Sequence, residues 1–103
     1  MAKSYNLNRL AYFVAVFETG SFTTAAERLG VGKSIVSRQI TQLEREVGVL
    51  LLVRTTRKVE PSEAGQVFYV RCRKILALAD QAFAEMSRFN DISRYTPKEK
   101  PAT

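Results

Sequence analysis

Two helical patterns separated by a glycine-containing break restrict the fold of this chain more than any other feature. The first, residues 22–29, is short and carries the adjacent small residues Ala25 and Ala26. Residues 30–32 (Gly-Val-Gly) form the break before the longer second pattern. Small residues let two helix backbones approach closely, and Gly30 permits a chain reversal without a side-chain clash. We therefore expect two tightly packed helices joined by a short turn, the helix-turn-helix arrangement.

The second of these patterns has an apolar face and a polar face. Four- and three-residue spacing defines its predicted buried stripe, namely Val36, Ile40, Leu43 and Val47. The other faces carry cations and hydroxyl groups, which suit phosphates and base edges in the major groove of DNA. An ordinary solvent-exposed face is the alternative interpretation. The residues predicted to contact DNA from this helix are Lys33, Ser34, Ser37 and Arg38.

Two short extended segments, residues 50–54 and 58–61, predict a β-hairpin. Pro61 cannot donate to a strand ladder, so the hairpin should end there. Cations and hydroxyl groups gather at its tip, and arginine suits the narrow, electronegative minor groove of DNA. A tip charged only for solubility is the alternative. The residues predicted to contact DNA from this wing are Arg54, Thr56 and Arg57.

Residues 63–89 predict one long helix with a heptad-like apolar seam. A second line, Tyr69, Leu76 and Phe83, repeats every seven residues and widens the apolar face. A solitary surface helix should not leave such a face in water, so we expect burial against a second copy of the chain. The predicted dimer-interface residues are Phe68, Cys72, Ile75, Leu76, Ala79, Phe83 and Met86.

The predicted fold class is mainly α. A first helix over residues 6–18, with Asn6 as its cap, precedes the helix-turn-helix, and Ser21 and Ser62 are the expected caps of later helices. Residues 5–62 should form a winged helix-turn-helix of three helices and a short β-hairpin, with the helix-turn-helix at about 22–41 and the wing at about 50–61. The dimerisation, or linker, helix follows at 63–90. The polar residues 91–103 are expected to be a flexible tail.

The charge of the chain favours a polyanionic partner. It has 16 Lys and Arg against 10 Asp and Glu, a net charge of +6, which favours nucleic acid as the partner. The helix-turn-helix narrows this partner to double-stranded DNA. Nucleic-acid binding without sequence preference also fits this charge, but it gives the helix-turn-helix no purpose.

Catalysis is not expected, because histidine is absent, cysteine occurs once and no Gly-rich phosphate loop is present. We therefore predict no catalytic residue, metal or cofactor. The single cysteine favours a reducing, cytoplasmic setting. The sequence contains neither a membrane-spanning apolar stretch nor the apolar run of a secretory signal, so no membrane partner is predicted.

An ordered series of short motifs resembles the LysR-type regulators. The series covers about residues 6–90. Its first members are Phe13-Val14-Ala15-Val16, Gly20-Ser21-Phe22, Ala25-Ala26-Glu27-Arg28-Leu29, Val36-Ser37-Arg38-Gln39-Ile40, Leu43-Glu44 and Gly48. It then continues through Arg54-Thr55, Ala64-Gly65 and the long helix.

The resemblance implies a winged helix-turn-helix whose linker helix pairs with its counterpart and places two recognition helices on a pseudo-palindromic promoter site. It also implies DNA contacts from the start of the recognition helix and from the wing arginine, Arg54. Lys33-Ser34 stands where glutamine followed by proline or serine is frequent, so base preference does not transfer from relatives. Leu52 in place of phenylalanine and Ser62 in place of threonine leave the fold intact.

Family members normally continue into an effector domain of two α/β lobes, whereas this sequence stops before one could begin. No small-molecule ligand is therefore expected here, and we favour a DNA-binding fragment over a naturally short protein. The leading hypothesis is a dimeric, sequence-specific transcription regulator that recruits or excludes RNA polymerase. The alternative is a short helical module that heterodimerises with a full-length regulator and blocks it.

Overall fold

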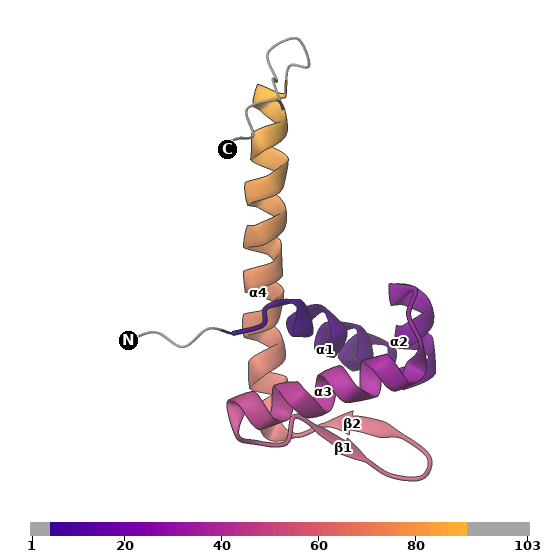
Figure 1. Ribbon diagram of the computed structural model, residues 1–103. Coiled ribbons are helices and arrows are strands. Elements are labelled where there is room, and N and C mark those ends of the chain that lie inside the picture. Colours follow the sequence, from indigo (N-terminus) through magenta and orange to yellow (C-terminus); the bar gives the residue numbers. More distant parts are fainter. Residues whose placement is uncertain (1–4, 91–103) are drawn as a thin grey trace, which may run out of the picture.

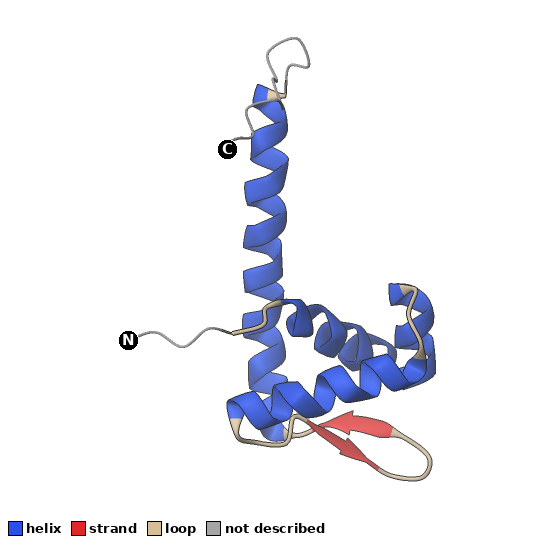
Figure 2. Cartoon of the chain, in the orientation of Figure 1, coloured by secondary structure: helices blue, strands red, loops and turns tan. Residues whose placement is uncertain are grey.

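Three helices, a two-stranded hairpin and one long helix follow each other in the computed structural model, which describes residues 5–90 (Figure 2). The first three helices pack together at one end of the long helix, whose other end projects away from them (Figure 1). This arrangement confirms the predicted mainly α winged helix-turn-helix with a long following helix. The expected tail, residues 91–103, lies outside the described residues. The elements are α1 (Asn8–Thr19), α2 (Phe22–Leu29), α3 (Lys33–Val47), β1 (Leu52–Arg54), β2 (Val59–Pro61), α4 (Glu63–Met86) and the 3₁₀ turn η1 (Ser87–Phe89).

The expected caps begin two of the helices. Ser21 Oγ accepts a hydrogen bond from the N–H of Thr24 at 3.1 Å, and Ser62 Oγ accepts one from the N–H of Gly65 at 2.9 Å. α1 begins later than expected, with Leu7 at its cap position. The Asn6 side chain nevertheless accepts a hydrogen bond from the N–H of Asn8 at 3.1 Å, so it satisfies one donor of the first turn.

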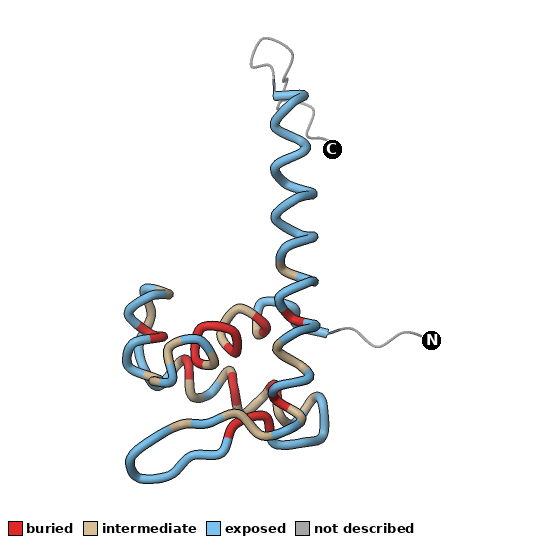
Figure 3. Tube along the Cα trace, turned by 180° about the vertical axis from the view of Figure 1, so that it is seen from behind, coloured by how far each residue is buried: buried red, intermediate tan, exposed pale blue. Residues whose placement is uncertain are grey.

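The core lies between α1, α2, α3 and the base of α4 (Figure 3). Ala25 and Ala26 are buried, as expected of residues at a close helix crossing. Of the predicted stripe on α3, three residues are buried, but Val47 is 37% exposed. That part of the prediction is wrong because Val47 lies in the last turn of α3 and borders two surface hollows that no side chain of residues 5–90 fills.

The base of α4 belongs to the core of its own chain. The ring of Phe68 packs 5.7 Å from that of Phe13, and Tyr69 stacks on Phe17. Cys72 is 0% exposed, so the prediction that it contacts a second chain is wrong, because no surface of its side chain is left for one. A helix seam has the same spacing whether it packs within a chain or between chains.

The hairpin and α4 meet at a glycine. β1 and β2 pair antiparallel with Leu52 opposite Pro61, and the hairpin ends at Pro61 as expected. The Leu51 carbonyl accepts a hydrogen bond from the N–H of Ser62 at 2.9 Å. A Cβ on Gly65 would lie only 2.1 Å from this carbonyl oxygen. Glycine at this position therefore lets α4 lie directly against the start of the wing.

The length of α4 does not make it a membrane segment. Its sequence mixes apolar side chains with Arg71, Arg73 and Lys74. Within residues 5–90, no helix combines the length and apolar character needed to cross a bilayer.

Candidate nucleic-acid interface

The start of α3 and the tip of the hairpin face each other across a groove of about 430 Å³. Three predicted wing residues border it from the hairpin side, and two predicted residues of α3 border it from the other. Ser34 and Arg38 do not line the groove, but both are exposed on α3. The predicted residues that line the groove are Lys33, Ser37, Arg54, Thr56 and Arg57.

Positive charge dominates this face of the molecule. Lys33, Arg38 and Arg57 are exposed, and within residues 5–90 none of the three forms an ion pair. Lys58 pairs with Glu60 at 3.2 Å, at an exposed site where such pairs contribute little. The three unpaired cations are therefore available to a polyanion. Because they would displace counterions from the phosphates, the binding affinity should fall as the salt concentration rises.

The wing tip is closed by Thr55. Its backbone N–H donates to the Lys58 carbonyl at 2.9 Å, and its hydroxyl oxygen accepts from the N–H of Lys58 at 3.1 Å. These bonds fix the turn and leave Thr56 and Arg57 exposed at its apex.

Arg54 is held from two sides. Its guanidinium carbon lies 4.7 Å from the centre of the Phe22 ring, and its Nη2 lies 4.0 Å from Glu44 Oε1. The other carboxylate oxygen, Glu44 Oε2, accepts hydrogen bonds from the N–H groups of Leu51 at 2.8 Å and Leu52 at 3.1 Å. The wing arginine is thus tied to both helices of the helix-turn-helix, through Phe22 on α2 and Glu44 on α3.

A second polar cluster ties the helix-turn-helix to α4. Glu18, near the end of α1, accepts hydrogen bonds from Arg28 at 2.8 Å, Tyr69 at 2.6 Å and Arg73 at 2.9 Å. The bond from Tyr69, followed by that from Arg28, holds the pKa of the Glu18 carboxyl below its ordinary value. Three helices therefore converge on one carboxylate.

The model of the bacterial regulatory helix-turn-helix proteins of the lysR family matches residues 7–66. The chain belongs to the LysR family. It is 54% identical over 76 residues to the HTH-type transcriptional regulator BudR of Raoultella terrigena, a match that covers 74% of this chain and 26% of BudR. The nitrogen assimilation regulatory protein nac of Klebsiella aerogenes is 46% identical over 77 residues, 75% of this chain and 25% of nac. The chain thus spans about a quarter of the length of these relatives.

Solved structures similar to this LysR-family chain include DNA complexes. The crystal structure of the BenM_DBD/catB site 1 DNA complex matches with a TM-score of 0.79 and 41% identity, over 82% of this chain and 96% of that one. The CbnR_DBD–DNA complex matches with a TM-score of 0.75 and 39% identity, over 82% and 95%.

Neither Phe22 nor Glu44 is among the residues predicted from the sequence of this LysR-family chain to shape the interface, although both occur in its motifs. For Glu44 a signal was available. A carboxylate in the last turn of a helix opposes the helix dipole, so it indicates a partner elsewhere. For Phe22 no such signal exists, because its contact with Arg54 joins residues 32 positions apart that only the fold brings together.

Proposed function

We propose that this chain is the DNA-binding part of a transcription regulator that reads a specific duplex site. The observation that carries the proposal is the cationic face on which the start of α3 and the wing tip border one groove. α3 would enter the major groove, and the wing would reach the backbone or the neighbouring minor groove. The similarity to BenM and CbnR domains in complex with DNA supports this assignment.

The proposed contacts divide by chemistry. Ser37 and Arg38, near the start of the recognition helix, would read base edges, and an arginine can bind guanine through two hydrogen bonds. Lys33 and Arg57 would neutralise phosphates, which fixes register without reading sequence. The full proposed set is Lys33, Ser34, Ser37, Arg38, Arg54, Thr56 and Arg57.

We further propose a homodimer through α4. The projecting half of this helix exposes large apolar side chains that no other part of residues 5–90 covers, with Phe83 83% exposed and Leu78 65% exposed. Of the predicted interface residues, Phe68 and Leu76 are already half-buried in their own chain. The proposed interface therefore centres on Ile75, Leu78, Ala79, Phe83, Met86 and Phe89.

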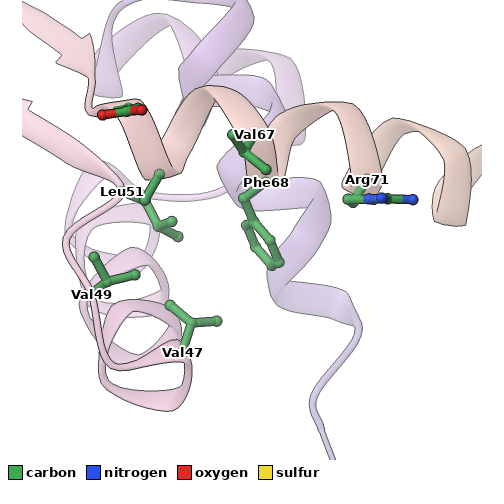
Figure 4. Close-up of a pocket in the computed structure, with 8 residues that line it drawn as sticks. Val47, Val49, Leu51, Val67, Phe68 and Arg71 are labelled. Atoms are coloured by element: carbon green, nitrogen blue, oxygen red, sulfur yellow. The ribbon is translucent and has the colours of Figure 1, made fainter.

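An antiparallel pairing of the two α4 helices accounts for both ends of this surface. Beside the base of α4 lies an open hollow of about 450 Å³ bordered by apolar side chains, including Val47, Val49, Val67 and Phe68 (Figure 4). In an antiparallel pair the projecting end of one α4 would reach this hollow on the other chain. Apolar side chains would then be covered at both ends of α4, which would stabilise the dimer.

The experiment that tests the function compares matched arginine variants. The labelled duplex carries the motif that wild type enriches from random DNA. Wild type, Arg38→Ala and Arg88→Ala are each titrated onto this duplex. Sedimentation of each protein alone checks that it is still a dimer. Arg88 is an exposed arginine of η1, so it controls for the loss of one charge. Its guanidinium lies 5.0 Å from the ring centre of Phe89, and the sedimentation check therefore has to show that the Arg88→Ala dimer is intact. We expect Arg38→Ala alone to lose roughly 10-fold or more in affinity, the size of one bidentate base contact. Unchanged affinity for Arg38→Ala would overturn the assignment of α3.

The remaining roles concern the whole regulator. We propose that it acts in the bacterial cytoplasm, where its DNA lies, that it recruits or excludes RNA polymerase through the position of its site, and that this part has no catalytic role.

The exposed face of α4 also favours a second function, pairing with α4 of a full-length relative. A mixture of the two proteins that gives heterodimers without loss of DNA binding would contradict a blocking role.

A further inference from the structure

We propose that Glu44 and Phe22 are positioning residues, which hold Arg54 and the wing in the geometry that binds DNA. The inference rests on the proposed DNA-binding function and adds two residues to it that are not expected to contact bases. The two residues are proposed to set the position of the wing relative to α3, and not to decide whether the domain folds.

Glu44 joins α3 to the wing through both of its carboxylate oxygens. Oε2 accepts from two successive backbone N–H groups, those of Leu51 and Leu52, at the point where the chain enters β1. Oε1 faces the guanidinium of Arg54 at 4.0 Å. The side chain of Glu44 is only 10% exposed, whereas that of Arg54 is 37% exposed. The shielded carboxylate therefore sets the start of the wing, and its second oxygen directs a guanidinium that stays accessible.

Phe22 supplies the second support. Its ring lies under the guanidinium of Arg54 at 4.7 Å, within the range of a cation–π contact. Phe22 is half-buried at the first position of α2 and borders the same groove as Arg54. A guanidinium stacked on an aromatic face keeps its planar hydrogen-bonding edge free.

The two supports limit the freedom that Arg54 would lose on binding. A flexible arginine loses side-chain entropy when it is fixed on DNA, and an arginine already held in place loses less. The ion pair with Glu44 is long, so a phosphate or base edge could replace it. The backbone hydrogen bonds of Glu44, which hold the wing, would remain.

A double-mutant cycle tests the proposal on the labelled duplex that carries the motif enriched by wild type. Glu44→Gln keeps a carbonyl acceptor for the Leu51 and Leu52 N–H groups but removes the charge facing Arg54. Phe22→Leu removes the aromatic face, and Phe22→Tyr keeps it. Each is measured with Arg54 and again with Arg54→Ala. Thermal unfolding of every variant separates a loss of binding from a loss of folded protein.

We expect Glu44→Gln and Phe22→Leu each to weaken binding about 3- to 10-fold when Arg54 is present, and less than about 2-fold in Arg54→Ala, since coupled contacts are non-additive. Phe22→Tyr should retain wild-type affinity. Equal losses with and without Arg54, or losses that follow the melting temperature, would overturn the positioning role. The positioning role would also be overturned if Arg54→Ala bound as tightly as wild type while Arg38→Ala bound more weakly. That result would leave the DNA-binding function intact. Failure of wild type to enrich any motif would overturn that function, and the positioning role with it.

Discussion

Tyr69 of α4 stacks on Phe17 of α1, with ring centroids 3.8 Å apart and planes within 4° of parallel. The hydroxyl group of the same tyrosine donates to Glu18, the next residue of α1. Together the two contacts fix the direction in which α4 leaves the helix-turn-helix. In a dimer that pairs through α4, this direction would set the distance between the two recognition helices and so the spacing of the half-sites.

Removal of the Tyr69 hydroxyl group should weaken this junction without breaking the stack. We expect Tyr69→Phe to lower the free energy of unfolding by about 1–2 kcal/mol, because it removes two hydrogen bonds, the one donated to Glu18 at 2.6 Å and the one accepted from Arg73 at 3.2 Å. Urea denaturation followed by circular dichroism measures it. Tyr12→Phe is a matched control, since the Tyr12 hydroxyl makes no hydrogen bond within the described part of the chain. Equal effects of the two substitutions would show that the hydrogen bonds of Tyr69 with Glu18 and Arg73 contribute nothing.

The same carboxylate predicts a pH dependence. The folded chain holds the pKa of Glu18 below the ordinary 4.5, mainly through the hydrogen bonds from Tyr69 and Arg28. A carboxylate with a lowered pKa stabilises the fold fully above pH 4.5 and loses this contribution as the pH falls through its folded value. The difference in unfolding free energy between wild type and Glu18→Gln should therefore be largest near neutral pH and shrink in acid. A constant difference from pH 7 to pH 3 would contradict the assignment.

A methyl group at position 65 should be poorly tolerated. Gly65→Ala would place its Cβ 2.1 Å from the Leu51 carbonyl oxygen, so α4 and the wing would have to separate. We expect a loss of roughly 1–3 kcal/mol in unfolding free energy, as for overpacked cores. At Gly32 the nearest atom to an added Cβ is 4.0 Å away, and Gly32→Ala should cost less than about 1 kcal/mol. Thermal melts that rank the two variants in the opposite order would be inconsistent with the close approach.

Sequence patterns predicted the fold well because its elements are local. Turn glycines, serine caps and apolar spacing each act over a few residues, and the bounds of α2 agree with the prediction. The predictions that Val47 is buried and that Cys72 lies in a dimer interface were wrong, because spacing defines the face of a helix but not what covers that face. Glu44 and Phe22 were missed because their roles depend on contacts with residues of the wing, which lie 7 to 32 positions further along the chain.

Cys72 should behave as a core residue, not as an interface residue. It is 0% exposed, and burial raises the pKa of its thiol to about 11. Because the thiolate is the reactive form, we expect native protein at pH 8 to react slowly with a thiol reagent and urea-unfolded protein to react rapidly. The reaction rate should be the same in a monomeric Phe83→Glu variant. A marked acceleration in that variant would mean that dimerisation, and not the core, shields the thiol.

Selection of bound sequences from a random duplex pool tests the central claim most directly. Purified chain is incubated with the pool near physiological salt, and the retained DNA is sequenced. A dimer that reads bases with α3 predicts enrichment of a motif with two-fold symmetry, and Phe83→Glu should lose the symmetric pair of half-sites. DNA binding that appears only at low salt and enriches no motif would contradict sequence-specific recognition.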